Sequence, residues 1–117
     1  MIRLLVSVRS VDEALAAAAG GADFIDLKEP GRGALGGLPV ATILEIVEAL
    51  RRRGSQLPVS ATIGDLAMHD LPAIQAQVHA VGECGVDYVK VGIERRAEAA
   101  PVLSWLAHCG RPVVPVF

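Results

Sequence analysis

Short apolar runs alternate with amphipathic stretches along the chain. The strand-like runs cover 2–8, 24–28, 59–63, 88–93 and 113–117, and helical periodicity covers 11–19, 39–53, 72–82 and 95–109. The order is therefore βαβαβαβαβ, which requires parallel strands joined by right-handed crossovers.

Several residues mark where these predicted elements begin and end. Ser10, with Glu13 three residues later, predicts a capping box at the first helix, and Gly20 and Gly21 predict its end. Pro101 falls inside the predicted helix at 95–109, where it predicts a kink or a restart.

Two α/β architectures suit this order, and the position of one lysine separates them. An open doubly wound sheet is covered by helices on both faces, so Lys90, between Val89 and Val91, would lie unpaired under a helix. A (β/α) barrel instead has an inner face that opens at the carboxyl ends of its strands. We therefore predict a parallel TIM-barrel-type domain over residues 1–117.

This predicted domain is a partial barrel, because a closed one needs eight strands and about 250 residues. About half a barrel leaves two strand edges open, which is a liability. Either a C-terminal half completes the barrel, or two copies associate as a homo-oligomer, or the short chain closes in some other way. We favour the missing half as the interpretation.

Three charged side chains share one face of the predicted strands. "GADFIDLK" at 21–28 and "GVDYVKVG" at 85–92 are an internal echo in which Lys90 aligns with Asp26. Because side chains alternate along a strand, Asp26, Lys28 and Lys90 have the same parity, with Phe24 and Tyr88 below them. We expect them to converge at the mouth of the barrel.

Two amines beside a carboxylate are typical of Schiff-base chemistry. A second cation or burial lowers the pKa of an amine in general, and the neutral amine is a nucleophile for carbonyl groups. A carboxylate beside it holds the amine or moves protons. Two other interpretations stay open: Lys28 as a plain strand-end charge, and Lys90 with Asp26 as a structural ion pair.

Further polar residues follow the predicted strands and are candidates for binding substrate. The glycine-rich stretch 29–37 carries Arg32, which suits a phosphate, although a mobile lid is an equal alternative. Ser60 and Thr62 share the parity of the charged group, and we add Ser7 from the first strand. Asp65 either lines the site or caps the next helix.

Composition excludes several classes of function. Aromatic residues make up 3% of the chain and the net charge is −2, which argues against nucleic-acid binding. The chain is 52% hydrophobic, with a mean hydropathy of +0.45, yet no run approaches the ~18 apolar residues of a membrane span. The opening residues do not suit a signal peptide, so we expect a cytoplasmic protein without membrane partners.

The remaining residues with reactive side chains carry no motif. Cys84 and Cys109 lack a CxxC spacing, so we expect reduced, half-buried thiols and no metal site. His79 and His108 are expected at the surface or at helix ends. The run 51–53 is an arginine cluster expected at the end of a helix, where cations oppose the negative end of its dipole.

The motifs "DLKEPGRGALGG", "SATIGDL" and "DYVKVGI", in this order, resemble the (5-formylfuran-3-yl)methyl phosphate synthase family, also called 4-(hydroxymethyl)-2-furancarboxaldehyde-phosphate synthase. The resemblance covers essentially all 117 residues, while family members are about twice as long. It implies a TIM barrel that condenses two molecules of glyceraldehyde 3-phosphate, with loss of phosphate and water, for methanofuran synthesis. It also implies Lys28 as the Schiff-base lysine, Lys90 as proton acceptor, Asp26 in support, and no cofactor.

Two functions from other classes remain as alternatives. One is a non-catalytic α/β domain that binds a phosphorylated ligand or a protein partner through its open edges. The other is a flavodoxin-like receiver domain, which is disfavoured because Ser7, Val8 and Arg9 stand where such domains carry acidic residues after the first strand.

Overall fold

The computed structural model describes residues 2–32 and 35–117, so Gly33 and Ala34 of the glycine-rich stretch lie outside the described residues. In chain order the elements are β1 (Leu5–Val8), α1 (Val11–Ala19), β2 (Phe24–Leu27), the 3₁₀ turn η1 (Pro30–Arg32), α2 (Val40–Arg52), β3 (Val59–Thr62), α3 (Leu71–Gly82), β4 (Tyr88–Gly92), α4 (Ala99–Leu106) and β5 (Val113–Val116). The predicted βαβαβαβαβ order is confirmed.

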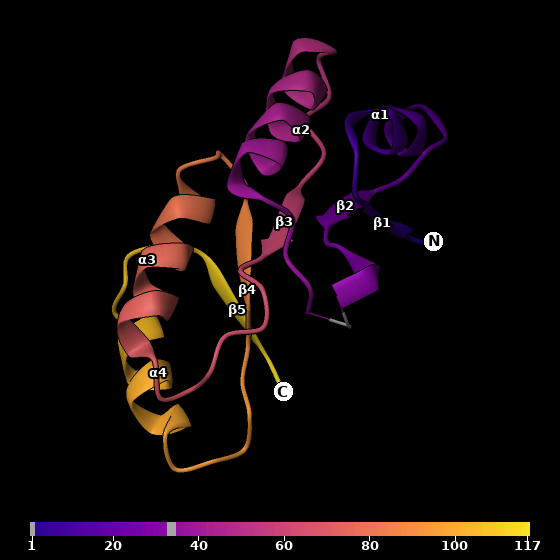
Figure 1. Cartoon of the computed structure of the whole chain (residues 1–117). Coiled ribbons are helices and arrows are strands. Elements are labelled where there is room, and N and C mark those ends of the chain that lie inside the picture. Colours follow the sequence, from indigo (N-terminus) through magenta and orange to yellow (C-terminus); the bar gives the residue numbers. More distant parts are fainter. Residues whose placement is uncertain (1, 33–34) are drawn as a thin grey trace.

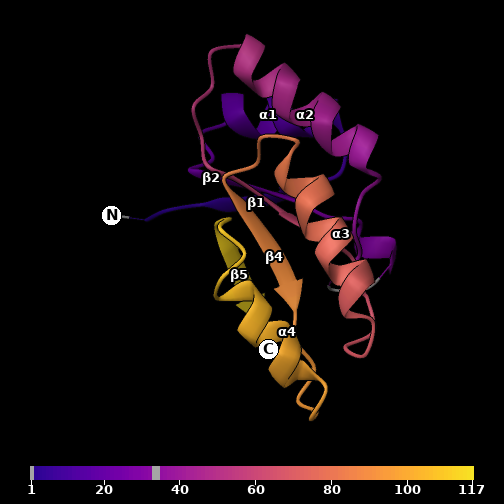
Figure 2. The same ribbon diagram turned by 90° about the vertical axis from the view of Figure 1, so that its left-hand side faces the viewer.

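The strand order places the helices on one face of the sheet. In the described part of the chain five parallel strands follow one another as β1-β2-β3-β4-β5, without a reversal of direction. Right-handed crossovers in such an order all fall on the same side, whereas a doubly wound sheet reverses its order and is covered on both sides. Figures 1 and 2 show α1 to α4 along one side of the curved sheet. This is the arrangement of a (β/α) barrel segment.

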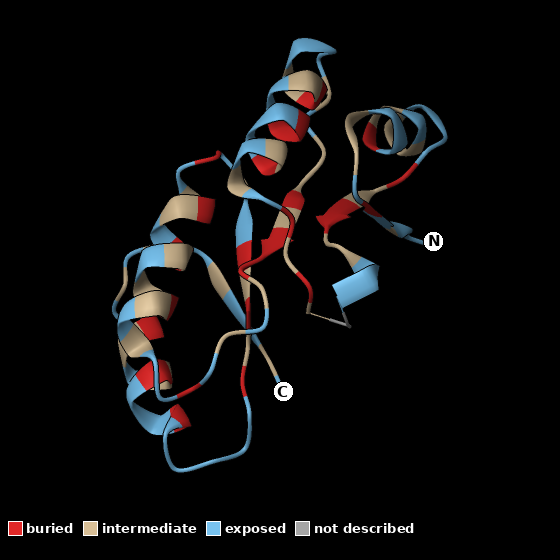
Figure 3. Cartoon of the chain, in the orientation of Figure 1, coloured by how far each residue is buried: buried red, intermediate tan, exposed pale blue. Residues whose placement is uncertain are grey.

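The two faces of the sheet differ in burial, and Figure 3 shows buried, intermediate and exposed residues along the strands. The face under the helices carries the fully buried core, namely Ile25, Leu27, Val59, Ala61, Val89 and Val91. On the opposite face Leu5, Tyr88 and Val114 are 53%, 46% and 39% exposed. In the described residues Asp26 and Thr62 are the buried polar side chains of the molecule, and both belong to this otherwise open face.

Some predicted boundaries were wrong. The first strand begins at Leu5, and Ile2 is 93% exposed. The last helix begins at Ala99 instead of 95, so Pro101 lies in its first turn, where its missing N–H breaks no helical bond and no kink is needed.

The helix caps were predicted in part. Ser10 caps α1 by accepting the Glu13 N–H at 3.2 Å, as expected, while the Glu13 carboxylate accepts the N–H of Arg9 instead of that of Ser10. Asp70 caps α3 through the Ala73 N–H at 3.2 Å, so the capping role considered for Asp65 was wrong.

The echoed aspartates Asp23 and Asp87 fasten each strand pair at its amino end. Asp23 donates its N–H to the Leu4 carbonyl at 2.8 Å and accepts the Leu4 N–H on Oδ2 at 2.7 Å. Asp87 does the same with Val59, at 2.8 Å for both bonds. Each aspartate thus binds both backbone groups of one residue, which fixes the register of β2 on β1 and of β4 on β3.

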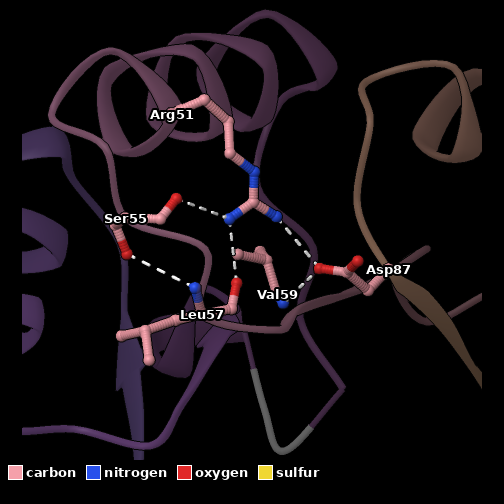
Figure 4. Close-up of polar contacts among 5 residues, drawn as sticks. All are labelled: Arg51, Ser55, Leu57, Val59 and Asp87. Carbon is pink, nitrogen blue, oxygen red and sulfur yellow. Dashed lines mark hydrogen bonds and ion pairs between the residues drawn. The ribbon is translucent and has the colours of Figure 1, made fainter.

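The second of these clamps carries an arginine as well (Figure 4). Arg51 lies 3.0 Å from Asp87 Oδ2 and donates to the carbonyls of Ser55 and Leu57 at 3.2 and 2.9 Å. The first residue of the predicted arginine cluster therefore joins α2 to the amino ends of β3 and β4.

Candidate active site

One carboxylate on the open face is contacted by side chains from three other strands. Asp26, on β2, is 2% exposed. Its Oδ1 accepts the Ser60 hydroxyl of β3 at 2.7 Å, and its Oδ2 lies 3.5 Å from the Ser7 hydroxyl of β1 and 3.3 Å from the Lys90 amine of β4. These donors compensate the burial of a charged group.

The parallel register explains why these residues meet. Ser7, Asp26 and Ser60 are direct partners across β1, β2 and β3, so their side chains lie at one level. Lys90 is paired with Thr62, one level nearer the carboxyl ends. Its long side chain reaches back across Ser60 to Asp26, and it remains 27% exposed. The amine is therefore held by a buried acid and still reaches solvent.

Lys28 lies at the level of Lys90 and is separate from the carboxylate. The β2–β3 register, continued by one residue, places Lys28 beside Thr62, which is beside Lys90. The two lysine Cα atoms are thus two strand spacings apart, ~10 Å. The structure describes both Lys28 and Asp26, and their charged groups are not within ion-pair distance. Of the three side chains predicted to converge, Asp26 and Lys90 meet and Lys28 does not join them.

The Lys28 side chain lines a hollow of about 310 Å³ at the carboxyl ends of β1 and β2, together with Ser7, Val8, Arg9, Glu13 and Pro30. Arg9 in this hollow lies 3.6 Å from Glu13 and 3.8 Å from Glu29. Within residues 2–32 and 35–117 the Lys28 amine has no hydrogen-bond or ion-pair partner. The Lys90 amine, by contrast, is paired with Asp26.

Arg32 and Asp65 lie in a different hollow. It measures about 510 Å³ and is lined by Arg32, Gly36, Gly37, Leu38, Pro39, Ile63, Gly64, Asp65, Leu66 and Gln77. Gln77 and Ile63 belong to the helix-covered side, so this hollow does not open onto Asp26. The structure brings Arg32 and Asp65 together but does not join them to the three charged residues.

Thr62 is 3% exposed and its hydroxyl is already engaged. It donates to the Leu35 carbonyl at 3.1 Å and accepts the Gly64 N–H at 3.2 Å. Leu35 itself was not among the predicted site residues. The sequence signal that could have pointed to it is Gly92, because a glycine within a strand often marks the close approach of another segment.

Below the charged level the open face is apolar. Phe24 and Tyr88, expected beneath the charged row, line a hollow of about 210 Å³ with Leu5, Ile25, Pro58, Ser60, Lys90 and Val114. Lys90 therefore stands at the boundary between an apolar floor and the polar level above it.

Features elsewhere in the described residues complete the inventory of chemical groups. Cys84 is buried and Cys109 half-buried, and both are free thiols. Burial, with the negative charge of Glu83 second, raises the pKa of Cys84 above its ordinary value. No three His, Cys, Asp or Glu side chains in 2–32 and 35–117 are placed to share a metal ion. No helix in these ranges has the length and apolarity to cross a membrane.

Comparison of the sequence with known proteins identifies one family. Residues 4–114 match the family model described as 4-HFC-P synthase. The chain is 40% identical over 111 residues to the (5-formylfuran-3-yl)methyl phosphate synthase of Methanopyrus kandleri, covering 95% of this chain and 45% of the relative. It is 44% identical over 115 residues to a Methylorubrum extorquens protein provisionally named for the same activity, covering 98% and 46%. The chain thus spans about half the length of these relatives.

Solved structures resemble the chain in fold. The protein described as CutC from Streptococcus agalactiae superposes with a TM-score of 0.73 at 17% identity, covering 98% of this chain and 59% of that one. The 2,3-dimethylmalate lyase of the PEP mutase/isocitrate lyase superfamily gives 0.66 at 17% identity, covering 95% and 43%. At such identity these likenesses concern the fold alone, and they agree with a TIM-barrel-type segment.

Proposed function

The chain belongs to the 4-HFC-P synthase family, and we propose that it supplies the Schiff-base half of a (5-formylfuran-3-yl)methyl phosphate synthase. The substrate would be glyceraldehyde 3-phosphate, condensed with a second molecule of itself for methanofuran synthesis. The observation that carries this proposal is the ion pair of Lys90 with buried Asp26, at 3.3 Å. Lys28 lies at the level of Lys90, and its amine has no partner among the described residues.

In this proposal the two lysines have different roles because their surroundings differ. The Lys28 amine attacks the aldehyde carbon, a C–N bond forms, and the resulting carbinolamine loses water to give an iminium. The iminium draws electrons from the neighbouring C–H bond, whose proton passes to a base. Lys90 is held by Asp26 and is suited to move that proton after passing its own to the carboxylate. The iminium formed on Lys28 is the electron sink, so this scheme uses no metal or organic cofactor.

The remaining part of the active site would come from further β/α units. A closed barrel has eight strands, and the described residues supply five, with β1 and β5 at the open edges. We propose that the units corresponding to the second half of the relatives pair with both edges. They would cover the exposed Leu5, Tyr88 and Val114 and complete the phosphate-binding part of the mouth.

Borohydride trapping tests the proposed chemistry. The chain is incubated with glyceraldehyde 3-phosphate and sodium borohydride, alone and mixed with the C-terminal half of the Methanopyrus kandleri relative, and the adduct is located by peptide mass. At aldehyde concentrations too low to alkylate ordinary amines, we expect an adduct on Lys28, none in Lys28→Arg, and a rate reduced about 100-fold in Lys90→Arg, as is typical for the loss of a general acid–base group.

Two results would contradict the proposal. One is an adduct that persists in Lys28→Arg because it forms on Lys90. The other is the absence of any Lys28 adduct in both the chain alone and the mixture. Reversible binding of the sugar phosphate without an adduct would favour the alternative of a non-catalytic α/β domain.

A further inference from the structure

The level above Thr62 and Lys90 receives no side chain from β3 or β4. Gly92 follows Lys90 by two positions on β4 and therefore lies on the same face, while Gly64 follows Thr62 beyond the end of β3. The backbone ladder continues to this level, because the Ile63 N–H donates to the Lys90 carbonyl at 3.1 Å. Gly92, which has no side chain, leaves room on the open face of β4 directly above Lys90.

Leu35 fills this room from the segment between β2 and α2. A methyl group built on Gly92 would overlap Leu35 Cδ1, so the leucine packs directly on the strand. Its carbonyl accepts the Thr62 hydroxyl at 3.1 Å. Leu35 is thus attached to β4 by its side chain and to β3 by its backbone.

The two glycines after Leu35 allow this close approach. A Cβ on Gly37 would lie 3.1 Å from the Gly64 nitrogen, and a Cβ on Gly36 would overlap the Glu29 carbonyl. The Gly36 carbonyl accepts the Glu29 N–H at 2.9 Å, next to Lys28. In the described part of the glycine-rich stretch, residues 35–37 therefore dock on β3 and β4.

We propose that Leu35 is a selectivity residue of the mouth: its side chain forms an apolar wall over Lys90 that admits short aldehydes and excludes longer ones. This inference deepens the proposed function and rests on it for the choice of aldehydes. The wall follows from the contacts with Gly92 and Thr62, which do not depend on any reaction. Thr62 is then a positioning residue that holds the wall through the Leu35 carbonyl.

Hydrogen exchange of the Glu29 amide tests whether the segment is docked. We expect Gly92→Ala and Leu35→Ala to speed this exchange about tenfold, since each removes the packing that holds residues 35–37. Thr62→Val should do the same and Thr62→Ser should retain the wild-type rate. Leu15→Ala, a half-buried leucine on α1, is the matched control and should leave the rate unchanged. A wild-type rate in both Gly92→Ala and Leu35→Ala overturns the docking.

Reductive alkylation tests the selectivity. Lys28 and Lys90 are the two lysines of the chain, so an adduct at each is read directly by peptide mass. At high aldehyde concentration exposed amines are alkylated whether or not Lys28 is unusually reactive. We compare labelling of Lys90 by glyceraldehyde 3-phosphate and by erythrose 4-phosphate, which is one carbon longer. Leu35→Ala should raise the ratio of long to short adduct about tenfold, the usual discrimination for one extra carbon in an apolar pocket.

The outcomes separate the two claims. An unchanged ratio in Leu35→Ala overturns the selectivity role, and a change of the same size in Leu15→Ala does so too. If Lys28 shows no greater reactivity than an ordinary amine, the proposed function fails, whereas the ratio at Lys90 still decides on Leu35.

Discussion

The β1–β2 and β3–β4 pairs begin in the same way and end differently. In both, an aspartate binds the two backbone groups of one residue on the preceding strand, at 2.7–2.8 Å. Three residues further along, the first pair carries Asp26 and the second carries Lys90, and these two side chains meet at 3.3 Å. The repeated aspartate contacts fix the register of each strand pair, whereas the charged residues that follow them differ between the two pairs.

The same comparison holds two residues later. Lys28 occupies the position that Gly92 occupies in the second pair. The first pair therefore presents an amine at the mouth, whereas the second presents a bare backbone on which Leu35 packs. The same local sequence pattern thus places an amine at this position in one pair and a contact site for Leu35 in the other.

The largest effect is expected from breaking the contact between the two pairs. Asp26→Ala leaves the partly buried Lys90 cation, 27% exposed, without its partner, which we expect to lower the free energy of unfolding by about 3 kcal/mol. Lys90→Met is the companion variant, and it leaves the Ser7 and Ser60 hydroxyls to stabilise Asp26. Urea denaturation measures both, and a loss below about 1 kcal/mol for Asp26→Ala would mean that the pair is only a surface contact.

The two clamps should differ in strength because of Arg51. We expect Asp87→Ala to cost about 2 kcal/mol and Asp23→Ala about 1 kcal/mol, since both aspartates are solvent-accessible and only Asp87 also has an arginine partner. A double-mutant cycle of Asp87→Ala with Arg51→Met isolates the difference. Equal losses in the two aspartate variants, or no coupling in the cycle, would mean that Arg51 stabilises only the loop at Ser55 and Leu57.

The alternation of side chains and the echo were enough to predict that Asp26 and Lys90 meet. Parity fixes the face on which a residue lies, and the aligned glycines fix its level. Parity does not fix where a long side chain ends, so the separation of the Lys28 amine from the carboxylate, two residues away along the chain, could not be predicted. The parallel fold was predictable because strand-like and helical periodicity alternate along the chain, although the start of the last helix was predicted wrongly.

Contacts made by loops and long side chains escaped prediction for a physical reason. Arg51 matched a helix-end charge, and nothing local indicates that its guanidinium reaches Asp87, 36 residues later. Leu35 lies in a glycine-rich stretch that resembles a phosphate loop, while its packing depends on Gly92 in a distant strand. Arg32 and Asp65 do lie together, as loop ends can, but on the side away from Asp26.

The position shared by Lys28 and Gly92 gives a smaller contrast. Lys28→Ala removes a side chain without a partner among the described residues, and we expect a change in unfolding free energy within about 0.5 kcal/mol. Gly92→Ala places a methyl against Leu35 and should cost about 1 kcal/mol. Thermal or urea unfolding of the two variants side by side is the measurement. A greater loss for Lys28→Ala would mean that its amine has a structural partner.

The smallest effect concerns the residue before the echoed glycine, which is Gly20 in the first pair and Cys84 in the second. Burial raises the pKa of Cys84 above its ordinary value of 9.0, so the folded state keeps the thiol protonated where the unfolded state ionises. The thiol therefore favours folding fully below pH 9, and this contribution is lost as the pH rises through the raised pKa. Between pH 8 and 10 we expect the free energy of unfolding of the wild type to fall by more than that of Cys84→Ala, with a difference of under about 1 kcal/mol. Wild-type and variant unfolding curves that fall equally over this range would contradict the assignment, and iodoacetamide should modify Cys109 faster than Cys84 at pH 8.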